Sequence, residues 1–130
     1  MALSPVTTTF AHEPVGAAFG INAYGPGFLE VNGVRYTAPL ILHPDTGPEP
    51  QPGLLLSSLT AQWLEQLRPR GPEIILGGTG EKQRFLPASA LAPLMSARIG
   101  VECMTLGAAC RTFNVLVSEG RKTIAVFLFD

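Results

Sequence analysis

Four small residues in a row, the Gly-Gly-Thr-Gly segment Gly77–Gly80, directly follow a short apolar run and are the first candidate for a site. Glycines leave backbone N–H groups free to approach an anion, and open α/β sheets bind ligands at the carboxyl ends of their strands. The segment is not a Walker loop, because Glu81 stands between the last glycine and Lys82, and it lacks the third glycine of the dinucleotide fingerprint. Two interpretations stay open, an anion cradle and a tight turn that lets the sheet meet a neighbouring segment. The residues that would hold a ligand are Gly78, Thr79 and Gly80.

A polar cluster further along the chain is the second candidate, and its members are Arg111, Thr112, Asn114, Glu119 and Arg121. Arg111 and Asn114 are three residues apart, which places them near one face of a helix. Such a cluster predicts a polar rim around the glycine segment, able to bind a carboxylate or phosphate through arginine. The alternative is structural: Asn114 bonds a loop backbone, and Glu119 pairs with an arginine.

The sequence predicts no catalytic residues, no metal and no cofactor. Cys103 and Cys110 do not form a C-x-x-C motif, and a nucleophilic cysteine needs a nearby base. The two histidines, His12 and His43, lie in segments that give no argument for bringing them to a cysteine. Two histidines and two cysteines without ligand spacing do not predict a metal site either.

Composition restricts the class of protein. The chain has 130 residues, 46% of them apolar and 15% charged, with a formal net charge of −1. This suits one folded domain with its own core, and it argues against nucleic-acid binding, which needs concentrated positive charge. The longest apolar run, Ile124–Phe129, is too short to cross a bilayer, and residues 1–18 lack a signal-peptide pattern. We therefore expect a cytoplasmic protein with a loosely ordered arm over 1–18 and a single α/β domain over 19–130.

The first half of the chain predicts strands and turns. Phe28–Val31 and Val34–Thr37 flank Asn32-Gly33, a dipeptide that favours the type I′ turn of a hairpin. Phe19–Tyr24 is expected to pair at an edge. His43–Gly53 holds four prolines and two glycines and is expected to be a loop.

The second half alternates between strand and helix patterns. Thr60 and Thr105 are expected N-caps, and another helix is expected near Ser89, with Pro93 tolerable only in its first turn. The expected apolar face of the last helix is Ala109, Thr112, Phe113 and Leu116. The expected strands are Glu73–Leu76, Ile99–Met104 and Thr123–Phe129.

Helices that connect successive strands make those strands parallel, with right-handed crossovers. The last strand shows no alternation, which suits a strand covered on both faces. The predicted fold is therefore a three-layer α/β arrangement, with a mixed central sheet of about five strands and an N-terminal β-hairpin part.

Several segments together resemble the DUF-498 family, a domain of unknown function, over about residues 19–129. The segments that carry the resemblance are Ile75–Gly80, Ile99–Thr105, Ala108–Leu116 with Glu119-Gly120-Arg121, and Ile21–Tyr36. The resemblance implies a three-layer fold with a mixed five-stranded sheet and a hammerhead-like N-terminal part. It implies no established enzyme activity. The family includes a mitochondrial complex I assembly factor, so it also implies assembly of a respiratory complex through protein contacts.

The leading hypothesis is thus a non-enzymatic interaction protein, an assembly or stability factor for a membrane-associated complex of the respiratory type. Its expected partners are proteins, and the chain itself is expected to be a monomer or a weak homodimer. The alternative is an anionic small-molecule binding domain or enzyme with its site at Gly77–Gly80. Phe85 is either a binding anchor or a cover over the sheet, since it lies between Arg84 and the Pro87 turn.

Overall fold

A computed structural model of the chain describes residues 7–9 and 17–130, and it contains two β-sheets and three α-helices in this part of the chain. The smaller sheet consists, in spatial order, of β1 (Thr8–Thr9), β2 (Ile21–Gly25), β3 (Phe28–Val31) and β4 (Val34–Tyr36). The larger sheet consists, in spatial order, of β6 (Gly47–Pro50), β5 (Leu40–His43), β9 (Thr123–Leu128), β7 (Ile74–Thr79) and β8 (Gly100–Met104). The helices are α1 (Ala61–Glu65), α2 (Ala88–Ser96) and α3 (Leu106–Ser118).

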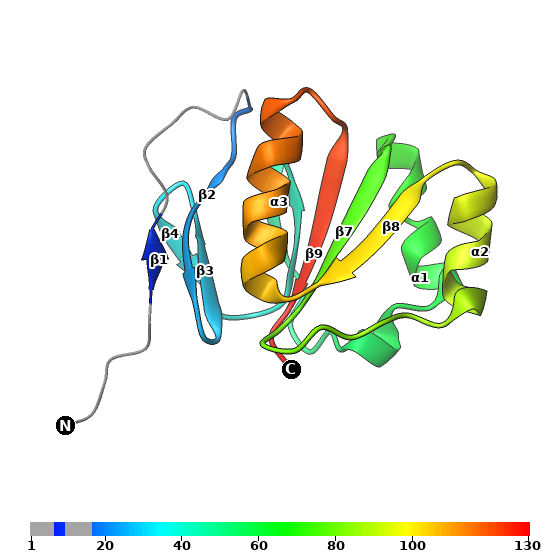
Figure 1. Ribbon diagram of the computed structural model, residues 1–130, viewed down its shortest axis with the longest axis horizontal. Coiled ribbons are helices and arrows are strands. Elements are labelled where there is room, and N and C mark those ends of the chain that lie inside the picture. Colours follow the sequence, from blue (N-terminus) through cyan, green and yellow to red (C-terminus); the bar gives the residue numbers. More distant parts are fainter. Residues whose placement is uncertain (1–6, 10–16) are drawn as a thin grey trace.

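The larger sheet has a parallel centre. β7 pairs in parallel with both β8 and β9, as the alternating pattern predicts, while β5 joins β9 antiparallel, so the sheet is mixed, in agreement with the predicted fold. Every residue of β9 is buried, which confirms that its unbroken apolar run belongs to a strand covered on both faces. Figure 1 shows α3 on one face of this sheet and α1 and α2 on the other.

Two apolar clusters correspond to these two faces. Phe113 and Ala109 of α3 pack with Leu76 and Phe127 on one side of the sheet. On the other side, Leu64 of α1 and Leu94 of α2 pack with neighbouring residues of the same strands. The two predicted N-caps are confirmed at the N-termini of α1 and α3. Thr60 Oγ1 accepts a hydrogen bond from the Trp63 N–H at 3.1 Å, and Thr105 Oγ1 accepts one from the Ala108 N–H at 3.3 Å.

The smaller sheet packs against α3 on the side away from the larger sheet (Figure 1). The hairpin prediction is confirmed: Asn32 and Gly33 have φ of 49° and 84°, as a type I′ turn requires. The prediction that Phe19–Tyr24 lies at an edge is wrong, because β2 runs between β1 and β3. Most of the predicted arm over 1–18 falls outside the described residues, and Thr8–Thr9 within it form β1.

The expected loop over His43–Gly53 is a second correction. Gly47–Pro50 form β6, which pairs with β5 at the border of the sheet. Prolines are compatible with an edge strand whose missing N–H groups face outward. The tertiary pairing therefore overrides a composition that is typical of loops.

Three further features differ from the predictions: the end of β7, the position of Pro93 in α2 and the buried face of α3. β7 continues to Thr79, so Gly77 and Gly78 lie within a strand and only Gly80 turns. Pro93 lies in the interior of α2, where its missing N–H removes one helical hydrogen bond. The buried face of α3 is rotated from the expected one, because Cys110 and Val117 are buried while Thr112 and Leu116 are partly exposed.

Candidate functional site

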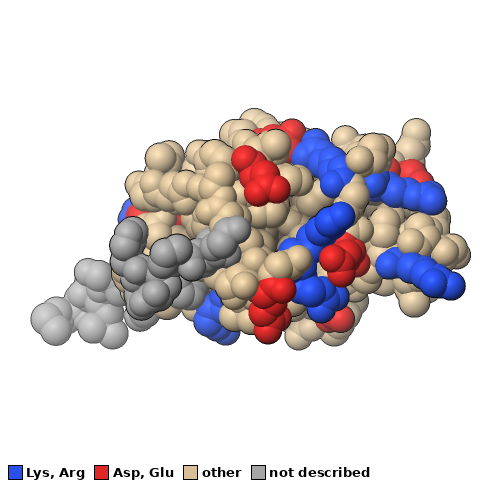
Figure 2. All heavy atoms as spheres, turned by 90° about the horizontal axis from the view of Figure 1, so that it is seen from above, with Lys and Arg blue, Asp and Glu red and all other residues tan. Residues whose placement is uncertain are grey.

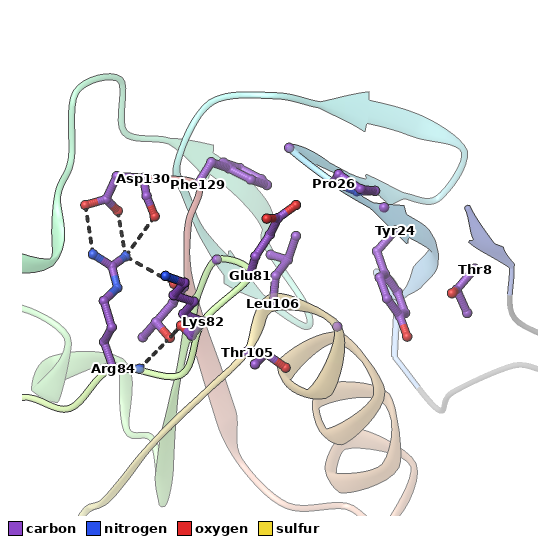
Figure 3. Close-up of a pocket in the computed structure, with 15 residues that line it drawn as sticks. Thr8, Tyr24, Pro26, Glu81, Lys82, Arg84, Thr105, Leu106, Phe129 and Asp130 are labelled. Carbon is purple, nitrogen blue, oxygen red and sulfur yellow. Dashed lines mark hydrogen bonds and ion pairs between the residues drawn. The ribbon is translucent and has the colours of Figure 1, made fainter. Parts of the chain in front are cut away.

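A groove with a volume of about 800 Å³ lies where the three parallel strands end. Its floor is the loop after β7, and its walls are the start of α3, the β2–β3 turn and the end of β9. The residues that line it are Thr8, Tyr24, Gly25, Pro26, Gly27, Thr79, Gly80, Glu81, Lys82, Arg84, Thr105, Leu106, Gly107, Phe129 and Asp130 (Figure 3). The groove lies at the carboxyl ends of the strands, where the sequence places the first candidate site, and its use as a binding site stays a prediction.

Thr79 shapes the loop beneath the groove. Its side chain is 1% exposed, and Oγ1 donates to the Lys82 carbonyl at 2.6 Å. The same oxygen accepts from the Arg84 N–H at 3.0 Å. A buried hydroxyl with both a donor and an acceptor partner fixes the chain that follows Gly80, so this threonine is structural as well as part of the groove.

Arg84 ties the floor of the groove to the end of the last strand. Its guanidinium donates to the Asp130 Oδ1 at 3.0 Å, to the Asp130 carbonyl at 3.0 Å and to the Thr79 carbonyl at 3.1 Å. The hydrogen bond from Arg84 lowers the pKa of the Asp130 carboxyl below its usual range. The two charges therefore satisfy each other and are not free for chemistry on a ligand.

The Arg84–Asp130 pair predicts a specific pH dependence. The folded chain holds the Asp130 carboxyl as a stronger acid than the unfolded chain does, whose ordinary value is 3.8. The pair therefore stabilises the fold above about pH 4, and that stabilisation is lost as the pH falls through the lowered folded-state pKa. We expect the melting temperature of wild type to drop more steeply below pH 4 than that of Asp130→Asn. If the melting temperatures of the two proteins fell equally steeply below pH 4, the prediction would be contradicted.

Replacing the Thr79 hydroxyl should loosen the same loop. Thr79→Val keeps the shape of the side chain but leaves the Arg84 N–H and the Lys82 carbonyl without their hydrogen-bond partner. The free energy of unfolding should fall by about 1–3 kcal/mol. Urea unfolding measures the loss, and amide exchange of the residues after Gly80 should accelerate. Thr79→Ser retains the hydroxyl and is the matched control. Equal stability of the Val and Ser variants would show that the hydroxyl does not hold the loop.

The structure separates the predicted site residues into two groups. Thr79 and Gly80 line the groove, whereas Gly78 lies inside β7 against α3 and has no place for a ligand above it. A Cβ on Gly78 would lie 2.8 Å from Phe127 Cδ1. The same Cβ would lie 3.2 Å from the Cβ of Ala109 on α3, which supports the alternative interpretation, in which the glycine lets the sheet meet a neighbouring segment.

The α3 residues do not converge on the groove lining. Asn114 Nδ2 donates to the Ile21 carbonyl at 2.7 Å and its Oδ1 accepts from the Ile21 N–H at 3.1 Å, which joins α3 to β2. Arg111 donates to the Tyr24 hydroxyl, and its cation lies 5.8 Å from the ring centroid. Arg111 thus supports a residue of the groove wall from outside the groove. Thr112, one position further, is only partly exposed.

Glu119 and Arg121 lie at the opposite end of α3 from the groove. Arg121 Nε donates to Glu73 Oε2 at 3.2 Å, and Glu119 is the exposed C-cap of the helix. Hydrogen bonds from the Lys122 N–H and from Arg121 lower the pKa of Glu73. Arg121 therefore fastens the end of α3 to the beginning of β7 through Glu73, and not through the pairing of Glu119 with an arginine that the structural interpretation expects.

Several groove residues were not among the predicted ones. Glu81 extends between Phe129 and Leu106 toward the turn that carries Pro26 (Figure 3). Tyr24 packs directly on Gly107, where a Cβ would lie 2.6 Å from the ring. The glycine in the first turn of α3 is the one sequence signal for this contact, since it permits a close approach.

The cysteines have no catalytic environment in the described part of the chain. Burial raises the pKa of Cys110 to about 12, and burial also raises the pKa of the Cys103 thiol. Both therefore remain protonated and weakly nucleophilic at neutral pH. Among residues 7–9 and 17–130, no cluster of three potential metal ligands is present.

Charges of both signs alternate on the face shown in Figure 2. The described residues contain five ion pairs, which join Arg35 to Glu30, Arg68 to Glu65, Arg70 to Glu49, Arg84 to Asp130 and Arg121 to Glu73. Pairing of this kind leaves no continuous positive stripe on that face to follow a nucleic-acid backbone.

Phe85 is 75% exposed, next to the floor of the groove in sequence. Because most of its surface is open to solvent, Phe85 does not cover the sheet, and its role as a binding anchor stays a prediction. Phe85 follows directly after Arg84, a residue of the groove lining whose guanidinium is paired with Asp130.

The fold is a three-layer α/β arrangement with a groove at the carboxyl ends of its parallel strands. The chain belongs to the family described as protein of unknown function (DUF498/DUF598), whose model matches residues 21–128. It is 31% identical over 121 residues to a "13 kDa major membrane protein" of Francisella tularensis subsp. holarctica, covering 92% of this chain and 98% of that protein.

Two other relatives extend the comparison. The chain is 32% identical over 115 residues to human "NADH dehydrogenase [ubiquinone] 1 alpha subcomplex assembly factor 3", covering 85% of this chain but only 61% of the human protein. A crystal structure of a Bordetella parapertussis protein superposes with a TM-score of 0.80 at 36% identity, covering 90% of this chain and 100% of the other. None of the helices in the described residues is both long and apolar enough to span a membrane.

Proposed function

We propose that this chain is a non-catalytic protein-interaction domain that assists the assembly or stability of a membrane-associated complex of the respiratory type. The observation that carries the proposal is the 800 Å³ groove at the carboxyl ends of the parallel strands, whose lining residue Arg84 is followed directly by the exposed Phe85. The similarity of the chain to an assembly factor of NADH dehydrogenase supports the choice of a respiratory complex.

The composition of the groove favours a protein segment as its occupant. Tyr24, Leu106 and Phe129 give it apolar walls, and Pro26 forms part of its rim. Apolar and aromatic contacts surrounded by satisfied polar groups are typical of the centre of a protein interface. The chain itself would act as a monomer or weak homodimer on the cytoplasmic side of the membrane, without nucleic acid.

A deletion and complementation experiment tests the role. Deleting the gene from its host should lower the amount of fully assembled respiratory complex, measured by blue-native electrophoresis of membranes. Wild type should restore it, and Phe85→Ser should restore it poorly, because the variant lacks the anchor. Val115→Ser is the matched control, since Val115 is also an exposed apolar residue (54%) but lies on α3. An unchanged complex in the deletion strain would refute the proposal.

An anionic small molecule in the groove is the second candidate. Lys82 lines the groove, and the Arg84 N–H and guanidinium lie beneath it. The Glu81 carboxylate in the same groove opposes an anion, and Arg111 and Asn114 are engaged elsewhere. Thermal-shift measurements with nucleotides and with acyl or phosphate metabolites decide between the candidates, because a ligand of the folded state raises the melting temperature.

A further inference from the structure

The two edges of the larger sheet differ in their backbone chemistry. At one border, β6 carries Pro48 and Pro50 opposite Leu42 and Leu40. Because proline has no N–H to give to the ladder, both prolines occupy the positions whose backbone faces away from β5. An incoming strand would find no donors at these two positions, so this edge is protected.

The other border, β8, has no such protection. The Gly100 N–H donates to the Glu73 carbonyl at 3.0 Å, and the Met104 carbonyl accepts from Thr79 Oγ1 at 3.2 Å, so both residues face β7. Successive residues of a parallel strand alternate in direction, and Val101 and Cys103 therefore turn their backbone groups outward. Within the described part of the chain, the Val101 N–H, the Val101 carbonyl and the Cys103 N–H have no partner.

One side chain already makes the contact that an added strand would make. Gln83 Nε2 donates to the outward-facing Cys103 carbonyl at 3.0 Å, which shows that an amide fits along this edge. The Leu86 N–H lies against the Cys103 thiol, so the segment that carries Phe85 passes the end of β8. An extended chain laid along Gly100–Glu102 would end near this segment, which carries the exposed Phe85.

The surroundings keep the edge accessible. Figure 1 shows β8 as the last strand of the sheet, between α3 and α2, which cover the two faces of the sheet. Gly100 and Glu102 are exposed, and the side chains of Val101 and Cys103 pack toward the α2 side. The helices thus leave the backbone of the edge free while they partly bury the side chains of Val101 and Cys103.

We infer that β8 is the docking site for an extended segment of a partner protein, which adds to the sheet as a sixth strand and places an apolar side chain against Phe85. Main-chain hydrogen bonds to Val101 and Cys103 provide the pairing, as in other cases of strand addition. The inference rests on the proposed interaction role and adds the conformation in which the partner is bound.

Amide exchange followed by NMR tests the inference with a defined probe. The probe is the peptide acetyl-Lys-Thr-Val-Thr-Val-Thr-Lys-amide, and the control is the same peptide N-methylated at its five central residues. In the free protein, the Val101 and Cys103 amides should exchange faster than those of Glu102 and Met104. At about ten times the dissociation constant, the probe should slow both by about tenfold, and the methylated peptide should not.

Two variants separate backbone pairing from side-chain contact. Val101→Pro removes the outward N–H without removing a bond to β7, whereas Val101→Ala removes only the side chain. The Ala variant should keep the protection by the peptide and the Pro variant should lose it. Absence of protection in wild type, or equal protection by the methylated peptide, would overturn the inference. A dimer in solution that Val101→Pro dissociates would also overturn it, because a second copy would then occupy the edge.

This experiment uses no respiratory complex, so its failure is separable from failure of the proposed function. If the peptide does not bind but gene deletion still lowers complex assembly, the assembly role stands and the mode of binding is wrong. If the peptide binds and deletion has no effect, the edge accepts a strand for another purpose.

Discussion

Gly78→Ala should destabilise the fold by about 3 kcal/mol, a large effect for the addition of one methyl group. The new Cβ would lie 2.8 Å from Phe127 Cδ1 and 3.2 Å from the Cβ of Ala109. Phe127 and Ala109 are completely buried, so neither can move aside into solvent. Relieving both contacts requires the Phe127 ring on β9 to shift within the core and α3 to move away from the sheet, and urea unfolding would measure the loss of stability.

Two other glycines provide matched controls for Gly78. Gly100 also lies in a strand of the same sheet, and its nearest neighbour to a new Cβ is the Glu73 carbonyl at 3.9 Å, an ordinary contact. Gly77 is intermediate, because its Cβ would lie 3.2 Å from the partly exposed Cys103 thiol. The expected order of destabilisation is Gly78→Ala, then Gly77→Ala, then Gly100→Ala. A Gly78 variant as stable as the Gly100 variant would show that α3 does not depend on the close approach.

The parallel centre of the fold was predictable because local and global signals agree there. Thr123–Phe129 is apolar without alternation and lies next to a helix with clear cap and stop residues, Thr105 and Gly120. β6 was not predictable, because its prolines and glycine locally favour a loop and only pairing with β5 makes it a strand. The extension of β7 through Gly77 and Gly78 was missed for the same reason, since neither glycine has a side chain that indicates burial.

The location of the groove was predictable and most of its lining was not. Open α/β sheets place sites at the carboxyl ends of their strands, so Gly80 and Thr79 indicated the right corner. Tyr24 and Pro26 come from the smaller sheet, whose position against α3 is a tertiary property that no local pattern encodes. Arg111 and Asn114 were correctly placed near one face of α3. That face meets β2 instead of the groove, so their polar groups bind Tyr24 and Ile21.

Phe113→Ala should lower the free energy of unfolding by about 3–5 kcal/mol and should also widen the groove. Phe113 is completely buried at the centre of α3, in the cluster that includes Leu29 of the smaller sheet and Leu76 of the larger one. Truncation leaves a cavity in the helix layer that both sheets share, and the surrounding backbone can fill it only in part. Because Tyr24 is carried by the smaller sheet and packs on α3, loosening this layer should also release one wall of the groove.

Val115→Ala is the matched control for Phe113→Ala, because Val115 lies two residues further along the same helix and is 54% exposed. Its truncation changes helix propensity slightly and removes little buried area, so the free energy of unfolding should stay within about 0.5 kcal/mol of wild type. Chemical shifts of Tyr24 and Gly107 should move in the Phe113 variant and not in the Val115 variant. If Phe113→Ala lowered stability but left both shifts unchanged, the two sheets would be attached to α3 independently, and the groove wall would not depend on the shared core.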